Sequence, residues 1–226
     1  MLKIFIGWDK NEAVAWHVLA HSIMRRASKP VLISPVMLSQ IRDEFTRKRD
    51  PGQSTDFSHA RFMTPHLAAG GISVFMDCDM LCLTDITELE DIARANNDLD
   101  VLVVKHDYTP KTQSKFLGQK QEAYPKKNWS SLMVFNGHRQ AVRNLTPEYI
   151  NKASPMELHQ FQWAKSVGGL GKEWNHLVGE YPDREDAKIV HYTIGGPWFP
   201  EYKNCDYSEE WFDEYEHMTA TNRQES

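Results

Sequence analysis

Residues 74–81 read VFMDCDML, with two carboxylates one residue apart at the end of an apolar run. Side chains at positions i and i+2 of a strand point to the same face, so Asp77 and Asp79 should leave a buried strand over 72–76 side by side. Two neighbouring anions in a half-buried site repel each other and lose hydration. A hard divalent cation such as Mg²⁺ or Mn²⁺ relieves both penalties, so the stretch predicts a metal site.

Outward from this stretch, apolar runs and helical patterns alternate along the chain. The runs predict strands at 2–7, 31–37, 101–105, 132–135 and 188–192, the second an edge strand because it contains Pro35. Helical patterns start near residue 11 and also cover 57–69, 86–95 and the region up to about 167. This alternation predicts one α/β domain of Rossmann type, with a mostly parallel central sheet flanked by helices. Ligands of such sheets gather at the carboxyl ends of the strands.

Composition narrows the class of protein. The 226 residues carry a formal net charge of -5, which gives no general attraction for nucleic acid. No apolar run reaches the roughly 20 residues that a membrane-spanning helix needs. The cysteines, Cys78, Cys82 and Cys205, are too few for a disulfide scaffold and are typical of a reducing compartment, so we expect a cytoplasmic protein. We expect one main domain over 1–200 and an acidic, aromatic tail over 201–226 that packs on it.

Five motifs, in order along the chain, resemble glycosyltransferase family 8 and its relatives with the GT-A fold. They are SHARF (58–62), VFMDCD (74–79), SLMVFN (131–136), GKEWN (171–175) and HYTIGGPW (191–198). The resemblance spans about residues 2–199 and implies a single GT-A-like domain. It also implies a metal-dependent transferase that moves a sugar, with retention, from a nucleotide-diphosphate sugar such as a UDP-sugar to a saccharide or other hydroxyl acceptor.

The resemblance also assigns roles to individual residues. Asp77, Asp79 and His191 match the metal ligands, and two carboxylates with one imidazole suit Mn²⁺, or else Mg²⁺. The positions that match donor-binding residues are Asp9, Arg61, Cys78, Ser130, Ser131, Gly195 and Gly196. The positions near the reacting sugar are His159 and Gln160. The residues alone also allow plainer roles: an ion pair for Arg61, a helix cap for Asp9, and a simple turn at 195–196.

Three positions depart from the family pattern. The residues before the central strand read Trp129-Ser130-Ser131 where the family has Asn-Ser-Gly. His159 stands where the family has an aspartate, and Gly196 stands where it has a lysine. These departures leave the donor sugar, the stereochemical outcome and the catalytic nucleophile open.

Two other functions remain open at this stage. A non-catalytic nucleotide-sugar-binding module would explain the changes at His159 and Gly196. A phosphohydrolase of the haloacid-dehalogenase type also places Asp-X-Asp after an apolar strand, but its pair normally lies close to the N-terminus. The lysine-rich stretch 105–128 fits a lid over an anionic donor, steering of an anionic acceptor, or a solvated loop. His17 and His21, four residues apart on one helix face, favour packing over metal binding.

Overall fold

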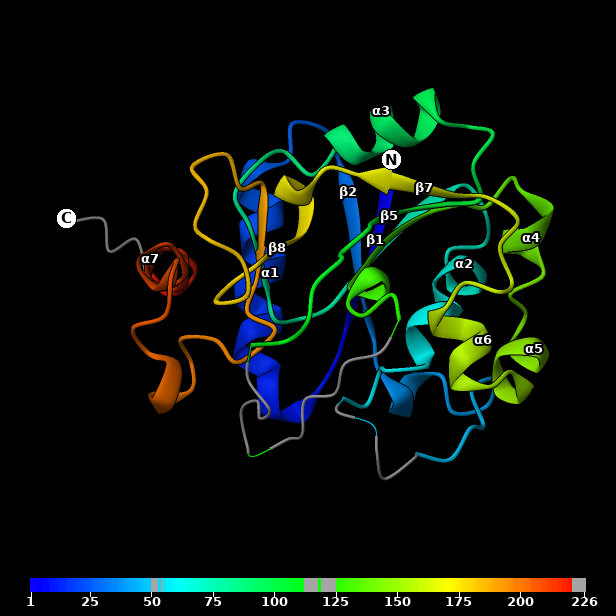
Figure 1. Ribbon diagram of the computed structural model, residues 1–226, viewed down its shortest axis with the longest axis horizontal. Coiled ribbons are helices and arrows are strands. Elements are labelled where there is room, and N and C mark those ends of the chain that lie inside the picture. Colours follow the sequence, from blue (N-terminus) through cyan, green and yellow to red (C-terminus); the bar gives the residue numbers. More distant parts are fainter. Residues whose placement is uncertain (50–52, 54, 112–117, 119–124, 221–226) are drawn as a thin grey trace, which may run out of the picture.

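The structure is a computed structural model that describes residues 1–49, 53, 55–111, 118 and 125–220. Its centre is a six-stranded sheet (Figure 1). In spatial order the strands are β2 (Val31–Val36), β1 (Leu2–Gly7), β3 (Ile72–Met76), β6 (Leu132–Asn136), β5 (Val101–Val104) and β7 (Val167–Leu170).

The central sheet is mostly parallel, as the sequence predicts. β1 pairs in parallel with both β2 and β3, and β5 pairs in parallel with β7. β6 runs antiparallel between β3 and β5 and is the reversed strand of this sheet. Every residue of β5 and β6 is buried, which explains their uninterrupted apolar sequences. β2 is one of the two edge strands, and Pro35 is tolerated there because the strand has no outer neighbour.

A second, three-stranded sheet lies beside the first. It has the order β4 (Met80–Cys82), β9 (Ile189–His191) and β8 (His176–Leu177). β9 pairs antiparallel with β4 and parallel with β8. The strand expected at 188–192 therefore exists, but it belongs to this small sheet and not to the central one. Nothing local in the sequence encodes such a long-range pairing.

The α-helices of the described residues surround the two sheets. They are α1 (Ala13–Arg26), α2 (Thr64–Leu67), α3 (Glu88–Ala95), α4 (Gln140–Arg143), α5 (Pro147–Lys152), α6 (Pro155–His159) and α7 (Ser208–Thr219). α1 packs against β1, β4 and α7. Among the described residues, every helix is too short or too polar to pass through a lipid bilayer.

The expectation of one long helix over 57–69 is wrong. The structure has a 3₁₀ helix, η3 (Ala60–Met63), followed directly by the four residues of α2. Pro65 explains the break, because it has no N–H to donate to the carbonyl of Arg61. The Thr64 hydroxyl donates to that carbonyl instead, at 2.8 Å. Gly70 and Gly71, both with positive φ, end the segment where the sequence predicts.

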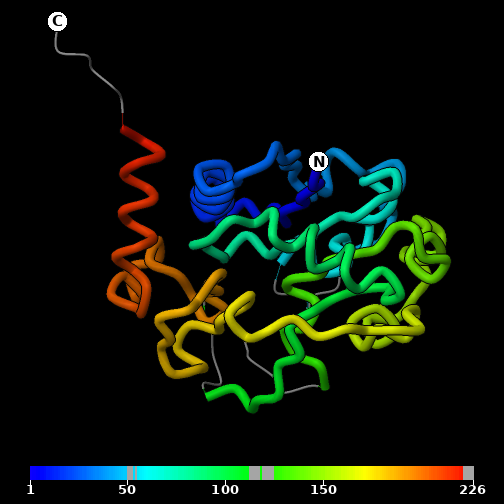
Figure 2. The backbone as a smooth tube through the Cα atoms, turned by 90° about the horizontal axis from the view of Figure 1, so that it is seen from above, coloured from blue at the N-terminus to red at the C-terminus, as the bar shows by residue number. Residues whose placement is uncertain are grey.

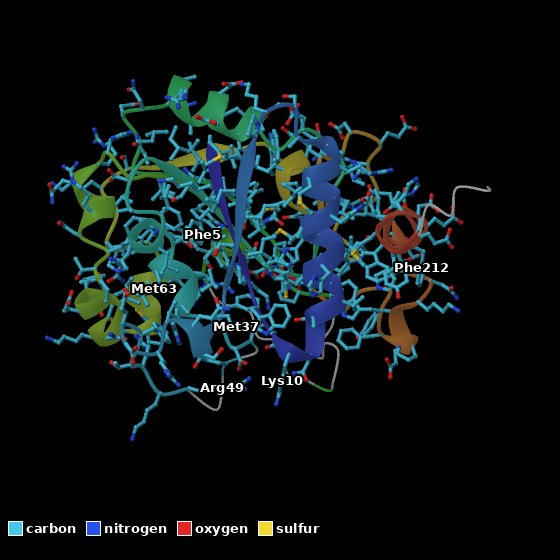
Figure 3. The ribbon with its side chains drawn as sticks, turned by 180° about the vertical axis from the view of Figure 1, so that it is seen from behind. Phe5, Lys10, Met37, Arg49, Met63 and Phe212 are labelled. Atoms are coloured by element: carbon cyan, nitrogen blue, oxygen red, sulfur yellow. The ribbon has the colours of Figure 1, made fainter. Side chains whose placement is uncertain are left out.

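The C-terminal helix α7 packs against the side of the domain that carries α1 (Figure 2). A hydrophobic cluster separate from the main core lies between them and includes Val18, Tyr192 and Trp211. In Figure 3, Phe212 is at this side of the molecule, whereas Phe5 and Met63 lie within the main domain. The structure thus places residues 208–219 against the body of the protein.

A buried carboxylate joins α7 to α1. The Glu214 side chain is fully buried and accepts hydrogen bonds from Arg26 Nη1 and from the His21 ring, with Arg25 Nη2 at 3.2 Å. His17, one turn earlier on α1, packs edge-on against Trp8 and Trp16. The histidine pair of α1 therefore serves packing and an ion cluster.

Replacing Glu214 by Gln should destabilise the fold at neutral pH by about 1–3 kcal/mol, because the arginines lose their buried partner. Burial would raise the pKa of Glu214, but the hydrogen bonds from Arg26 and His21 outweigh it and hold the pKa below its ordinary value. The stabilisation is therefore present above the unfolded-state pKa of about 4.3 and is lost as pH falls through the lower folded-state pKa. Urea unfolding of both proteins at pH 7 and near pH 3 measures the difference.

Glu216→Gln is the matched control for this prediction, since Glu216 is exposed on the same helix. The control should change the free energy of unfolding by less than about 0.5 kcal/mol. Equal stability of the Glu214 and Glu216 variants at pH 7 would show that the buried cluster does not hold α7.

Candidate metal centre and donor site

The two aspartates lie in the short connection between the two sheets. β3 ends at Met76, and the backbone N–H of Asp77 donates to the Ser131 carbonyl at 2.9 Å, just before β6. β4 begins at Met80, directly after Asp79. The connection lies at the carboxyl end of β3. The same edge receives the residues that follow β1 and β2, and Figure 3 shows Lys10 and Met37 there.

The small sheet delivers His191 to this connection. β9 pairs with β4 so that His191 stands opposite Met80, and the N–H of Tyr192 donates to the Asp79 carbonyl at 2.8 Å. One ligand atom from each of Asp77, Asp79 and His191 lies within 4.8 Å of the others. His191 Nε2 is 3.2 Å from Asp79 Oδ1. The structure therefore brings together three side chains from distant parts of the sequence.

The chemistry of this cluster fits a divalent cation. The side chains of Asp77 and Asp79 are 14% and 12% exposed, and that of His191 is 2% exposed, so the cluster opens to solvent only on the carboxylate side. Two carboxylates with one imidazole match the ligand preferences of Mn²⁺, and carboxylates also suit Mg²⁺. A cation there would offset the mutual repulsion of the two anions.

Arg61 is the cation that the fold already supplies beside the cluster. Its Nη1 lies 2.9 Å from Asp77 Oδ1 and donates to the Ser130 carbonyl at 2.9 Å, while its Nε donates to the Ser58 carbonyl at 3.0 Å. The guanidinium group sits over the rings of Phe57 and Phe75. The ion pair that the sequence allows for Arg61 therefore exists, and it is made with a member of the cluster.

The residues expected near the sugar form a second group. Ser130 Oγ is 2.9 Å from His159 Nδ1, and the His159 ring packs edge-on against Phe62. Burial, followed by the charge of Arg61, lowers the pKa of His159 well below its ordinary value, so the imidazole is neutral at physiological pH. Gln160 follows α6 as its C-cap, and its carbonyl accepts a hydrogen bond from Lys126 Nζ at 2.6 Å. Through Ser130 this group contacts Arg61, and through Arg61 it contacts Asp77.

Other predicted donor-site residues have clear packing roles in the structure. Asp9 is buried and caps the 3₁₀ helix η1 (Lys10–Glu12), accepting from the N–H of Asn11 at 2.9 Å. The Cys78 thiol is fully buried in the core, and burial raises its pKa well above the ordinary value. Any contact between Cys78 and a donor must therefore use its backbone.

Neighbouring aromatic rings leave no room for a side chain at positions 195 and 196. A Cβ on Gly195 would lie 2.5 Å from the Tyr202 ring, and a Cβ on Gly196 would lie 2.0 Å from the Trp198 ring. Trp198 in turn contacts Tyr192 and Trp211. The motif after His191 thus packs on the cluster beneath α7.

Asn175 is a site residue to which the sequence assigned no role. It is completely buried at the end of the 3₁₀ helix η6 (Lys172–Asn175), and its Oδ1 is 3.0 Å from His191 Nδ1. Its Nδ2 donates to Ser131 Oγ at 2.8 Å. The only sequence signal was its place at the end of the GKEWN motif.

The described part of the lysine-rich stretch is anchored by main-chain carbonyls. Lys105 Nζ donates to the Val167 carbonyl at 2.8 Å, and Lys111 Nζ donates to the Gly179 carbonyl at 2.9 Å. Lys126 binds the Gln160 carbonyl, as noted above. Lys115, Lys120 and Glu122 lie outside the described residues.

Comparison with known proteins places the chain in a family. No protein-family model matches it. It is 39% identical to Protein CDI from Arabidopsis thaliana over 234 residues, which cover 99% of this chain and 90% of that protein. The chain belongs to the Protein CDI family.

The fold of this CDI family member resembles that of solved glycosyltransferases. The galactosyltransferase LgtC has a TM-score of 0.62 and 11% identity, and the match covers 98% of each chain. The bifunctional glycosyltransferase WbbM has a TM-score of 0.66 and 19% identity over 95% of this chain, which spans only 49% of WbbM. GlyE of Streptococcus pneumoniae TIGR4 has a TM-score of 0.61 and 14% identity over 95% of this chain and 61% of its own. The chain has the GT-A-like glycosyltransferase fold.

Arg61→Lys should destabilise this CDI family member by about 1–3 kcal/mol. The planar guanidinium group uses two separate nitrogens to reach Asp77 and the Ser58 and Ser130 carbonyls, whereas a lysine has a single nitrogen and cannot make all three contacts. Urea unfolding measures the change. Arg94→Lys is the control, since Arg94 pairs with Glu90 on the surface and is 64% exposed there. The control should change the stability by less than about 0.5 kcal/mol. Equal effects of the two substitutions would contradict the role given to Arg61.

Proposed function

We propose that the protein is a metal-dependent glycosyltransferase of the hexosyltransferase type. It transfers a sugar, with retention, from a nucleotide-diphosphate sugar to a hydroxyl group of a saccharide or other acceptor, and a UDP-sugar is the donor. The observation that carries the proposal is the cluster of Asp77, Asp79 and His191 at the carboxyl-end edge of a GT-A-like sheet. The similarity to glycosyltransferase structures supports it at the level of the fold.

In this proposal Asp77, Asp79 and His191 hold Mn²⁺ or Mg²⁺. When bound, the ion supplies positive charge that stabilises the diphosphate leaving group. Arg61 orients Asp77 and partly offsets its charge through their 2.9 Å contact. Because Nη1 and Nε make its contacts with described residues, Nη2 is the nitrogen available for a donor phosphate.

The remaining residues would bind and orient the donor. Asp9 contacts the nucleotide base, and the Cys78 and Gly195–Gly196 backbone lies along the diphosphate. Ser130, Ser131, His159 and Gln160 face the sugar. A neutral His159 offers the sugar a hydrogen bond without the negative charge of the family's aspartate. We also propose a cytoplasmic location, which the buried free thiols of Cys78 and Cys82 support.

A melting experiment tests the donor site. In the presence of Mn²⁺, UDP at about 100 times the dissociation constant of UDP should stabilise the protein by about 2.7 kcal/mol. For a chain of this length the melting temperature Tm should rise by about 5–10 °C. Asp79→Asn should abolish the metal-dependent shift. Asp91→Asn, a change at an exposed carboxylate that pairs with Lys29, should keep it. If no nucleoside diphosphate gives a metal-dependent shift, the proposed function is wrong.

A turnover assay distinguishes the proposed transferase from the two alternatives, a non-catalytic nucleotide-sugar-binding module and a phosphohydrolase. Release of nucleoside diphosphate from a panel of nucleotide sugars should depend on Mn²⁺ and fall at least about 100-fold in Asp79→Asn, since the leaving group loses its charge stabilisation. NMR of the product anomer tests retention. Donor binding without turnover would favour the non-catalytic module. Phosphate release from simple phosphomonoesters would favour the phosphohydrolase.

A further inference from the structure

The two ring nitrogens of His191 face different partners. Nδ1 is 3.0 Å from Asn175 Oδ1, and Nε2 is 3.2 Å from Asp79 Oδ1. The ring is 2% exposed, so solvent does not decide which nitrogen carries the proton. The groups around it must therefore select the tautomer.

The orientation of the Asn175 amide follows from Ser131. The Ser131 hydroxyl donates its single hydrogen to the Asn128 carbonyl at 2.7 Å. Toward Asn175 the same oxygen can then only accept, so it requires the NH₂ group of Asn175, at 2.8 Å. The amide oxygen is thereby directed at His191 Nδ1. An amide oxygen only accepts, so Nδ1 must carry the proton.

We propose that Asn175 is a positioning residue that keeps a proton on His191 Nδ1 and thereby leaves Nε2 as the ring atom that faces the carboxylate cluster and would bind a metal. The inference rests on the proposed metal site, because it assigns Nε2 as the metal-facing atom. Partners of this kind orient metal-ligating histidines in many proteins. In this chain the hydrogen bonds run from Asn128 through Ser131 and Asn175 to His191.

Asn128, the first residue in this series of hydrogen bonds, is itself held in place. Asn128 has a left-handed backbone with φ 60, and its Nδ2 donates to Tyr108 Oη at 2.8 Å and to Thr193 Oγ1 at 3.2 Å. Asn128 therefore joins the segment after β5 to the segment after β9. This attachment fixes the carbonyl that determines the direction of the Ser131 hydroxyl.

Mn²⁺ binding by the metal-free protein, measured from the EPR signal of free Mn²⁺, tests the role of Asn175. Asn175→Leu should weaken Mn²⁺ binding about 10–100-fold, the effect typical of losing such a partner. Asn175→Asp keeps an oxygen for Nδ1–H, although the Ser131 hydroxyl must then turn from the Asn128 carbonyl toward the new carboxylate, so it should weaken Mn²⁺ binding less than Asn175→Leu does. Ser131→Ala, which frees the amide to turn over, should weaken binding in the same direction as Asn175→Leu.

Asn136→Leu is the matched control. Asn136 is also buried, at the far end of β6, and its Nδ2 donates to the Asn97 carbonyl at 2.9 Å. This variant should lose thermal stability but bind Mn²⁺ as before. If Asn175→Leu weakens Mn²⁺ binding no more than Asn136→Leu does, Asn175 is not a positioning residue.

Nitrogen-15 NMR of the His191 ring tests the tautomer without any variant. In the unmodified, metal-free protein Nδ1 should carry a proton, because its partner Asn175 Oδ1 can only accept. An Nδ1 without a proton would overturn the inference. If the tautomer is as expected but the unmodified protein binds no Mn²⁺, the proposed metal function fails and the assignment of the Asn175 amide stands. The two failures are therefore distinguishable.

Discussion

The antiparallel pairing of β4 with β9 is the interaction on which the candidate site depends. Without it Asp77 would still have Arg61 as a partner, but Asp79 would lack the imidazole of His191, which lies more than a hundred residues later in the sequence. Three residues of β4 pair with three of β9, and the register sets His191 opposite Met80. This pairing holds one ligand atom from each of the three side chains within 4.8 Å of the others, which is close enough for a single ion to reach all three.

The two aspartates of the cluster have different partners. Asp77 has a built-in cation in Arg61, which lies over two phenylalanine rings and donates to two carbonyls. Asp79 faces the imidazole of His191, whose far side is fixed by Asn175. One side of the site thus has a permanent positive charge, and on the other side the imidazole is held in place by an amide. The guanidinium group offsets part of the charge of the two anions, and a divalent cation would offset the rest.

The sequence predicted those features that depend on local patterns. The apolar runs at 2–7 and 101–105 became buried strands. Asp77 and Asp79 lie close together as expected, but in the connection after β3 and not on a strand, so the two-residue period does not account for their placement. The helix over 57–69 failed because a proline outweighed the apolar pattern. Membership of β9 in a second sheet, and the contact of Asn175 with His191, were not predictable because both arise from long-range packing that has no local signature. The resemblance to known motifs placed His191 in the site, although the residues alone would not have done so.

The β4–β9 pairing also has a consequence for folding during synthesis. β1, β3, β5 and β6 lie within the first 136 residues, so most of the main sheet can assemble while the ribosome still holds the rest of the chain. β9 ends at residue 191. Contacts of such wide sequence separation form slowly. The nascent protein should therefore pass through a stage in which the main sheet has formed but Asp79 is exposed and lacks its partner His191. During folding the chain should become compact first and gain its affinity for Mn²⁺ later.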